Sequence, residues 1–564
     1  MYLLAISNHN NNNEESLQLL EENDNEFIEL KNINTITGKY LLSFFYYKDF
    51  ILDENNFRNA SDFVIKYLKS ARKNDATAQC NLGSCYENGS GIDEDYNKAF
   101  EWYYKSAKNG YAEGQYNLGS CYFYGKGIKQ DIKKALIWYY RSAKNGHLEG
   151  QYNLGIYYYY GRGVNQNFTK AFEWYSKSAN NGHALGQNNL GYCYEQGKGI
   201  DKDYNKAFEW YSKSANNGCA EGQNNLGRCY EKGIGTDVDY DKAFELYSKS
   251  ANNGYALALN NLGQYYYYGL GTDKDYHQAF KWYSKSAENG CDKGQNNLGL
   301  CYEKGIGTYI NLNKAFEWYS KSAENGCIEG KNNLGRCYEN GIGTYINFNK
   351  AFELYSITAN NGCAEGQNNL GNCYYYGFGT DKDYDKAFEL YLKSANNGFT
   401  LSNNKLGECY YYGFGTDKDY DKAFEWYSKS ANHGCAEGRN NLGRCYENGF
   451  GAEKDYKKAF ELYSITANNG CAEGQNNLGN CYYYGRGITR DYKKAFELYS
   501  KSAKNGSALG QNNLGFCYEK GFGTSKDYKK AHEWYSKSAN NGCAEGQKRL
   551  KLLLLWYNNY SIYF

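Results

Sequence analysis

The side chains best suited to nucleophilic or metal chemistry are six histidines and 19 cysteines. Zinc-binding cysteines often come in pairs separated by two residues, and the sequence contains no such pair. Gly233-x-Gly235 has the spacing of a phosphate-binding loop, but it follows a predicted helix rather than a strand. Acidic residues recur at the same positions of every internal repeat, and an identical active site in each repeat is implausible. The sequence therefore predicts no catalytic residue, no metal site, no cofactor and no enzyme activity.

The elements that position these residues are copies of one unit that recurs every 36 residues. The stretch 220–254 shows this unit most clearly. The step Asn-Leu-Gly recurs at this interval, and in one further copy Lys405 replaces the Asn. Together these copies make 13 complete units without an insertion or a deletion. Self-similarity at a period of this length is typical of repeat architectures.

Each unit is predicted to form two helices joined by a glycine turn. Apolar and small residues recur along 220–231, and 239–252 follows the pattern of an amphipathic helix. Asp239 is placed to cap the second helix, and Gly254 follows that helix where a left-handed residue commonly ends one. The residues spaced for ion pairs on the outer face are Lys242, Glu245 and Lys249.

A single hairpin has too few large apolar side chains to offset the conformational entropy lost on folding. The missing burial must come from neighbours stacked on both sides. The sequence therefore predicts an all-α fold, a right-handed α-solenoid of 13 tandem hairpins with terminal capping helices. The expected parts are a non-repeat segment at 1–56, a degenerate capping half-repeat at 57–74, the repeat array at 75–542, and a capping helix with its tail at 543–564.

A set of recurring residues in the unit resembles a known repeat family. They are Ala220, Asn225, Leu226, Gly227, Tyr230, Gly233, Gly235, Asp239, Lys242, Ala243, Ala251 and Gly254, with a Trp or Leu position in the second helix. The pattern resembles the Sel-one-like repeat, a relative of the tetratricopeptide repeat, over residues 75–547. Members of that family are scaffolds and adaptors in signalling, protein quality control and host–microbe contact. The resemblance implies a binding role and supplies no catalytic residue.

Composition restricts the class of partner. Lys and Arg total 64 against 63 for Asp and Glu, and no basic stripe appears, so a nucleic-acid partner is not expected. The longest apolar stretch, Leu552 to Tyr557, is far shorter than a membrane span, so no membrane partner is expected either. The N-terminus lacks the basic lead and apolar length of a signal peptide, which favours a cytoplasmic protein.

The cysteines fall into register with the repeat. Of the 19, 11 lie four residues after the repeat Asn and seven lie six residues before it. Some secreted members of the family that the sequence resembles carry a disulfide in each unit. Cys219 and Cys229 would lie ~15 Å apart along one helix, and equivalent cysteines of adjacent units about 8 to 10 Å apart, both beyond the ~7 Å that a disulfide spans. The spacing therefore favours free thiols in a reducing compartment.

The first helix is expected to carry the partner-binding face. The positions four before, one before, three after and seven after the repeat Asn share a face opposite the apolar stripe, and the resemblance implies that this face is concave. Leucines four residues before the Asn add apolar side chains to it, at Leu185, Leu257, Leu401 and Leu509. The third position after the Asn varies most; its candidate binding residues are Tyr192, Arg228, Gln264, Leu300, Arg336, Arg444 and Phe516. Neutral drift at exposed sites is the alternative interpretation.

A second alternation follows the first helix. Six and seven residues after the Asn, seven units carry Glu and a polar residue, whereas six carry an aromatic pair. Tyrosine offers rigid contact area with a polar end, suited to gripping a peptide, and packing over the glycine turn is the alternative. The candidates are Tyr160, Tyr268, Tyr376, Tyr412 and Tyr484. A Trp that other units replace by Leu in the second helix is interpreted as core packing.

The sequence as a whole predicts a non-catalytic scaffold or adaptor. Protein or peptide segments would bind along the concave first-helix face of the solenoid. One alternative is a regulatory subunit of an enzyme complex in signalling or protein quality control. Another is a secreted effector that bears disulfides. The identity of the partners is not predicted.

Overall fold

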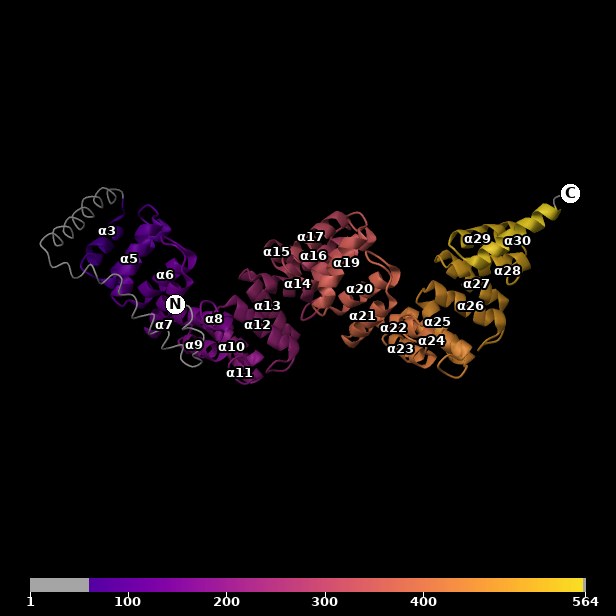
Figure 1. Cartoon of the computed structure of the whole chain (residues 1–564), viewed down its shortest axis with the longest axis horizontal. Helices are drawn as coiled ribbons and strands as arrows, with labels where there is room; N and C mark the ends of the chain where they lie inside the picture. The colour runs from indigo at the N-terminus through magenta and orange to yellow at the C-terminus, as the bar shows by residue number, and fades with distance from the viewer. Residues whose placement is uncertain (1–59, 561–564) are drawn as a thin grey trace, which may run out of the picture. The chain divides into compact units, whose positions relative to one another are not determined.

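The computed structural model describes residues 60–560, with side chains described up to residue 555. The predicted non-repeat segment at 1–56 lies outside the described residues, as does the start of the capping half-repeat at 57–74. Across residues 60–560 the chain forms 28 helices, labelled α3 to α30, and no strand (Figure 1). The predicted all-α fold, a solenoid of tandem helical hairpins, is confirmed.

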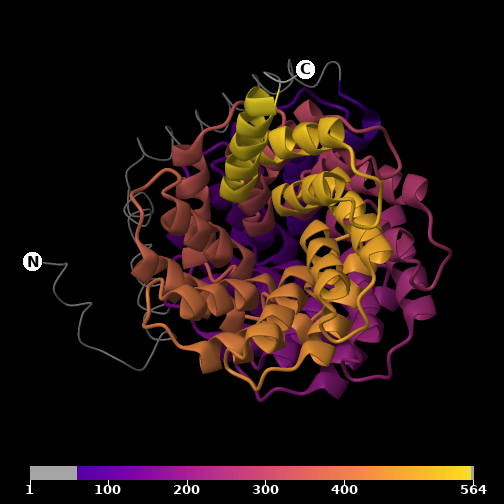
Figure 2. The same cartoon turned by 90° about the vertical axis from the view of Figure 1, so that its right-hand side faces the viewer.

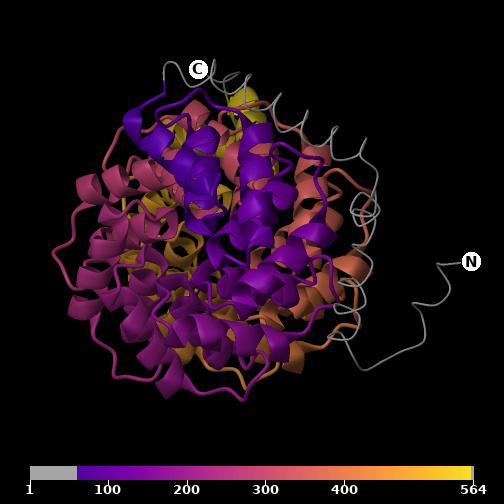
Figure 3. The same cartoon turned by 90° about the vertical axis from the view of Figure 1, so that its left-hand side faces the viewer.

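The chain divides into two compact units, one up to Trp282 and one from Tyr283, and the division falls within α15 (Tyr276–Glu288). Figure 3 has the first unit, indigo to magenta, toward the viewer. Its remaining helices are α3 (Asp62–Ala71), α4 (Ala76–Asn88), α5 (Tyr96–Lys108), α6 (Ala112–Tyr124), α7 (Ile132–Lys144), α8 (Leu148–Tyr160), α9 (Phe168–Asn180), α10 (Ala184–Gln196), α11 (Tyr204–Asn216), α12 (Ala220–Lys232), α13 (Tyr240–Asn252) and α14 (Ala256–Tyr268).

In the second unit the hairpins follow one another in a curved row, coral to yellow in Figure 2. Each helix packs against the next along the chain, so every hairpin is covered by its neighbours. The helices are α16 (Asp292–Lys304), α17 (Leu312–Glu324), α18 (Ile328–Asn340), α19 (Phe348–Asn360), α20 (Ala364–Tyr376), α21 (Tyr384–Asn396), α22 (Leu401–Tyr412), α23 (Tyr420–Asn432), α24 (Ala436–Asn448), α25 (Tyr456–Asn468), α26 (Ala472–Tyr484), α27 (Tyr492–Lys504), α28 (Ala508–Lys520), α29 (Tyr528–Asn540) and α30 (Ala544–Tyr560).

The helix ends of the hairpin α12–α13 follow from capping chemistry. The Asp239 carboxylate accepts a hydrogen bond from the Lys242 backbone N–H at 2.9 Å, which satisfies a free donor in the first turn of α13. Gly233 ends α12 with φ +68°, and Gly254 follows α13 with φ +80°, both in the left-handed region that favours glycine. The predicted cap and both glycine positions are confirmed.

The ion pairs on the outer face are partly as predicted. Lys249 pairs with Glu245 at 2.6 Å, one helical turn away. Lys242, however, pairs at 3.1 Å with the capping Asp239 and not with Glu245. The cap lies beside the lysine in the first turn, so it offers the nearer carboxylate.

The interior of each hairpin is closed by a tyrosine of the second helix against a glycine of the first. A Cβ atom added to Gly335 would come within 2.7 Å of the Tyr355 ring, so only glycine permits this approach. Tyr355 is fully buried in a cluster with Cys373, the cysteine four residues after the repeat Asn of the next unit. The glycine and the tyrosine recur in every unit, whereas Tyr157 and Tyr265 fill the Cys position in two units, so the close Gly–Tyr contact is the part of the interior that every unit keeps.

The Trp or Leu position of the second helix packs between hairpins, as predicted. Trp174 is buried in a cluster with Tyr140 and Leu190, and Leu246 packs against the cluster around Tyr211. Lysine side chains cover the outer face of the tryptophans, as where the Lys177 ammonium lies 4.0 Å from the centre of the Trp174 ring.

Consecutive first helices are also joined by asparagine side chains. Asn225 donates to the Asn188 side-chain oxygen of the preceding repeat at 2.9 Å, and Asn261 donates to Asn224 in the same way at 3.0 Å. The asparagine one residue before the repeat Asn is therefore buried; Asn224 is 2% exposed. This position was expected on the binding face, but its side chain is buried, because the amide is taken up by the contact with the next hairpin.

The two ends of the array carry single helices. At the N-terminal end α3 buries Val64 and Leu68. At the C-terminal end α30 buries Leu553, whereas Leu552 and Leu555 are 56% and 51% exposed. Among the described residues no helix is both long and apolar enough to cross a bilayer.

Candidate functional site

The candidate residues three positions after the repeat Asn mostly contact the preceding repeat. The Arg228 guanidinium donates to the Glu195 carboxylate at 2.6 Å, and Arg336 donates to Glu303 at the same distance. Arg444 lies over the Tyr411 ring, 5.6 Å from its centre. In the rest of the row, Tyr192 is exposed, Phe516 lies under the Arg549 guanidinium, and Gln264 and Leu300 are half-buried.

The alternation between Glu and aromatic repeats has a structural cause. In a Glu repeat the buried Tyr211 hydroxyl donates to Glu195 at 2.7 Å. In an aromatic repeat that carboxylate is missing, and Tyr391 instead donates to the Asn372 side chain at 2.8 Å. Burial removes each hydroxyl from water, so each needs an acceptor inside the chain. A polar residue at the variable third position supplies it in some of these repeats, as Asn480 does for Tyr499 at 2.7 Å.

The aromatic pairs of these repeats divide into a packed member and an exposed member. Tyr375 packs against Tyr384 and Phe414, with ring centres 5.3 and 5.6 Å apart, which is the packing over the glycine turn that was the alternative interpretation. The next residue points outward in each case, and the five candidates are exposed: Tyr160 61%, Tyr268 64%, Tyr376 44%, Tyr412 47% and Tyr484 52%.

Two shallow hollows lie along the first helices. The first, in the first unit, has a volume of about 560 Å³ and is formed where α10, α12 and α14 begin, between His183 and Tyr255. The second, in the second unit, has a volume of about 400 Å³ and is lined by residues of α20, α22 and α24. Each hollow spans three consecutive repeats and includes a leucine four positions before the repeat Asn, Leu185 in one and Leu401 in the other.

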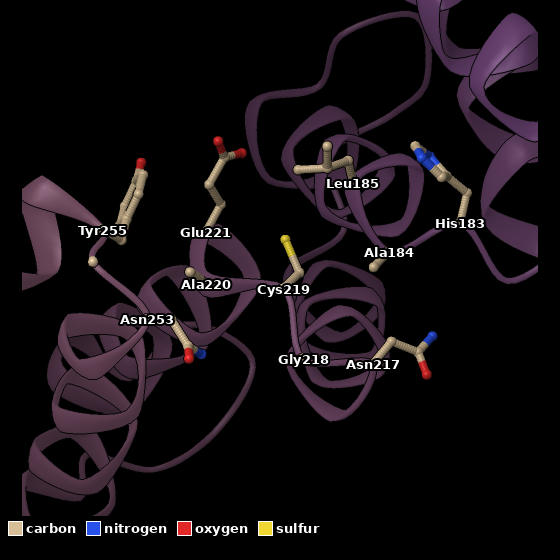
Figure 4. A pocket seen from close by; sticks show the side chains of 11 residues that line it. His183, Ala184, Leu185, Asn217, Gly218, Cys219, Ala220, Glu221, Asn253 and Tyr255 are labelled. Carbon is tan, nitrogen blue, oxygen red and sulfur yellow. The ribbon is translucent and has the colours of Figure 1, made fainter. Parts of the chain in front are cut away.

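The first hollow carries a single charged side chain, Glu221. Figure 4 shows Glu221 projecting to the same side as Leu185 and Tyr255. Burial raises the pKa of the Glu221 carboxyl above its ordinary value, and within the described part of the chain its hydrogen-bond donor is the Asn188 amide at 3.4 Å. Burial lowers the pKa of His183, so that imidazole is neutral at pH 7.

The second hollow differs by containing a cation. Lys405, which replaces the repeat Asn, lines it together with Leu401 and Glu437. Burial disfavours the ammonium, but the Glu408 carboxylate 3.1 Å away outweighs this effect and raises the pKa of Lys405 to about 12. The asparagine link to the preceding repeat is replaced as well, because Asn368 accepts a hydrogen bond from Ser402.

One exposed apolar patch was missed by sequence reasoning. Tyr309 is 89% exposed and Ile310 64%, and the next repeat repeats the pair with Tyr345 at 87% and Ile346 at 58%. These residues replace the mostly charged residues at this point of other repeats, since Thr-Tyr-Ile-Asn stands where many units have Thr-Asp-Lys-Asp. A comparison of the units at this position carries the signal that would have found the patch. Nothing else in the described residues indicates what covers it.

The cysteines form two groups. All 19 are free thiols; 13 are buried and six are half-buried, among them Cys219 in the first hollow. Burial raises the pKa of Cys229 to about 12. Within residues 60–560 no three His, Cys, Asp or Glu side chains come together as ligands for a metal ion.

Stacked helical hairpins of constant length define the chain as an α-solenoid repeat protein. The family model of the Sel1 repeat matches 13 consecutive segments, from 76–111 to 508–543. The chain therefore belongs to the Sel1 repeat family, as the resemblance implied. Repeat solenoids of this kind generally bind protein partners and are typically non-catalytic.

Several solved structures are similar to this chain. The c5321 protein, a protective antigen of uropathogenic Escherichia coli with an SLR fold, is 31% identical over 86% of this chain and 97% of its own, with a TM-score of 0.48. A Sel1 repeat protein from Oxalobacter formigenes is 31% identical over 43% of this chain and 96% of its own, with a TM-score of 0.40. Yeast Tom70 is 14% identical over 87% and 98%, with a TM-score of 0.32. No curated protein matches the chain.

Proposed function

We propose that the chain is a non-catalytic scaffold that binds protein or peptide segments along its first-helix face. The observation that carries the proposal is the pair of hollows, one formed where α10, α12 and α14 begin and the other lined by residues of α20, α22 and α24. A surface that continues from repeat to repeat suits an extended or helical segment lying across several units. The exposed tyrosines at the C-terminal ends of the first helices, such as Tyr376 and Tyr412, extend the apolar contact area.

The variable third-position residues belong to the same proposal. Tyr192 and Leu300 add side chains to the face, whereas Arg228 and Arg336 act through the carboxylates that they hold in place. Reversing the charge of these arginines would leave Glu195 and Glu303 without a cation, so loss of binding in such variants would not separate recognition from stability. Side chains without an internal role give the sharper test.

The test places a photo-crosslinking amino acid at Leu401 on the first-helix face or at Ile465 on the second helix. The two positions are matched, because both side chains are apolar and 51% and 46% exposed. With extract from the protein's own source, we expect discrete protein adducts from position 401 and none from position 465. Adducts from position 465 alone, or equally from both, would remove the first-helix face as the binding surface.

A further inference from the structure

We propose that the hollow between His183 and Tyr255 docks a peptide segment that presents an arginine or lysine side chain next to an aliphatic one. This inference rests on the proposed function and deepens it by naming the chemistry of the partner at one place on the face. It depends on the charge of the hollow, the surroundings of Glu221 and the apolar side chains beside it.

The charge of the hollow is negative and uncompensated. Glu221 is its one acidic side chain, and within the described residues no Lys, Arg or His forms an ion pair with that carboxylate. The carboxylate also acts on its neighbours: burial and then the charge of Glu221 raise the pKa of Tyr152 to about 12. A half-buried carboxylate without a counter-charge favours a cation over a neutral or anionic group.

Three other polar side chains of the hollow already have hydrogen-bond partners. The Asn217 amide donates to Gln187 at 2.8 Å, and the Asn253 amide donates to Gln223 at 3.1 Å. His183 accepts the Gly186 backbone N–H at 3.1 Å through Nδ1. These held side chains form a preformed rim around Glu221, the one acidic group of the hollow.

Apolar side chains flank the carboxylate. Leu185 is half-buried on one side of Glu221, and the Tyr255 ring lies on the other in Figure 4. The aliphatic stem of an arginine or lysine packs on such surfaces while its head reaches the carboxylate. The adjacent leucine explains the preference for an aliphatic neighbour in the peptide, because a free small cation would leave that surface uncovered.

The experiment measures charge preference with two matched peptides and the full chain. The probes are fluorescein-labelled Ser-Gly-Leu-Arg-Leu-Gly-Ser and the same peptide with citrulline, the neutral isostere of arginine. By fluorescence anisotropy at low salt, we expect the arginine peptide to bind about tenfold more tightly. The preference should shrink as salt is raised, because ions screen the pair.

Two variants locate that preference. Glu221→Gln should bring the ratio of the two dissociation constants close to one, and Glu221→Lys should reverse it. Glu209→Gln is the matched control, because Glu209 is an exposed carboxylate on the second helix α11, 59% accessible and paired with Lys213. It should leave the tenfold ratio unchanged. Thermal unfolding of each variant checks that the fold is retained.

The outcomes separate this inference from the proposed function. Equal binding of both peptides, with both lost in Leu185→Ser, would overturn the cation preference and leave the first-helix face as a binding surface. A preference that survives Glu221→Gln would place the cation elsewhere and overturn the inference. Absence of binding by either peptide would overturn it too, while the crosslinking test at Leu401 decides the broader proposal independently. Equal affinity for agmatine and the arginine peptide would show a small-cation site rather than a peptide site.

Discussion

The hairpin interiors and the first-helix face obey different rules. In the interiors the Gly335–Tyr355 contact is repeated along the array with the same partners. On the face the two hollows share a leucine and a glutamate but differ in the charge that surrounds them, since Lys405 lines only one. A side chain that touches both neighbouring hairpins has little freedom to vary, whereas one that lines a hollow can change without loosening the stack.

The variable third position shows that sequence variation alone does not identify the face. Arg228 and Asn372 differ because they serve different buried groups, a carboxylate in one repeat and a tyrosine hydroxyl in the other. Part of the variation at the third position therefore compensates for differences among the buried side chains that these residues contact. The first hollow is a better guide to recognition, because within the described residues its carboxylate, Glu221, pairs with no Lys, Arg or His.

The largest expected difference between interior and face is in thiol reactivity. Burial raises the pKa of Cys229 to about 12 from an ordinary 9.0, so at pH 8 its thiolate is about a thousandfold scarcer than that of an unshifted thiol. Half-buried Cys219 should react first. Mass spectrometry after brief alkylation of the native chain measures both sites, and equal labelling would contradict the division.

The same alkylation in denaturant tests the disulfide alternative. All 19 thiols should then react, because the structure holds each cysteine as a free thiol. Only a few reactive thiols without reductant would instead favour a disulfide-bearing secreted protein.

Next in size is the loss of stability on filling the interior. Gly335→Val places methyl groups against the Tyr355 ring, and we expect it to destabilise the hairpin α18–α19 by about 3 kcal/mol. Ile357→Thr, on the exposed face of the same hairpin, is the control and should cost less than about 0.5 kcal/mol. Hydrogen exchange of this hairpin measures both, and a valine without effect would refute the tight contact.

The features of the fold that recur within each unit could be predicted from the sequence, whereas contacts between units could not. The period, the hairpin, the Asp239 cap and the Trp or Leu packing position recur in the units, so the repeat itself revealed them. The burial of Asn224 could not be predicted, because it depends on the side chain of a residue 37 positions away in the next hairpin, Asn261. The hollows escaped for the same reason; Leu185 was recognised, but its neighbour Glu221 belongs to the following repeat.

A smaller effect distinguishes the two ways of satisfying a buried tyrosine. Tyr211→Phe removes a donor from Glu195, a buried carboxylate, and should cost about 1–2 kcal/mol even with Arg228 in place. Tyr391→Phe should cost about 0.5 kcal/mol, because half-buried Asn372 can accept from water instead. Urea unfolding of both variants gives the difference, and a larger loss for Tyr391→Phe would contradict this explanation.

The smallest expected effect would convert the second hollow to resemble the first. In a chain that already carries Glu221→Gln, Lys405→Asn removes the cation beside Leu401. The arginine peptide should then regain a preference of about threefold over its citrulline twin, weaker than in the first hollow because Glu437 is exposed and therefore better screened. An unchanged ratio would mean that Lys405 does not set the charge preference there.

The first-helix face, and not the outer surface of the second helices, is expected to make the contact with a peptide. The arginine peptide with a photoreactive leucine, crosslinked to the full chain and mapped by mass spectrometry, tests this most directly. Adducts confined to first-helix residues between His183 and Tyr255 are the predicted result. Adducts on the second helices, as around Trp210 and Lys213, would contradict it.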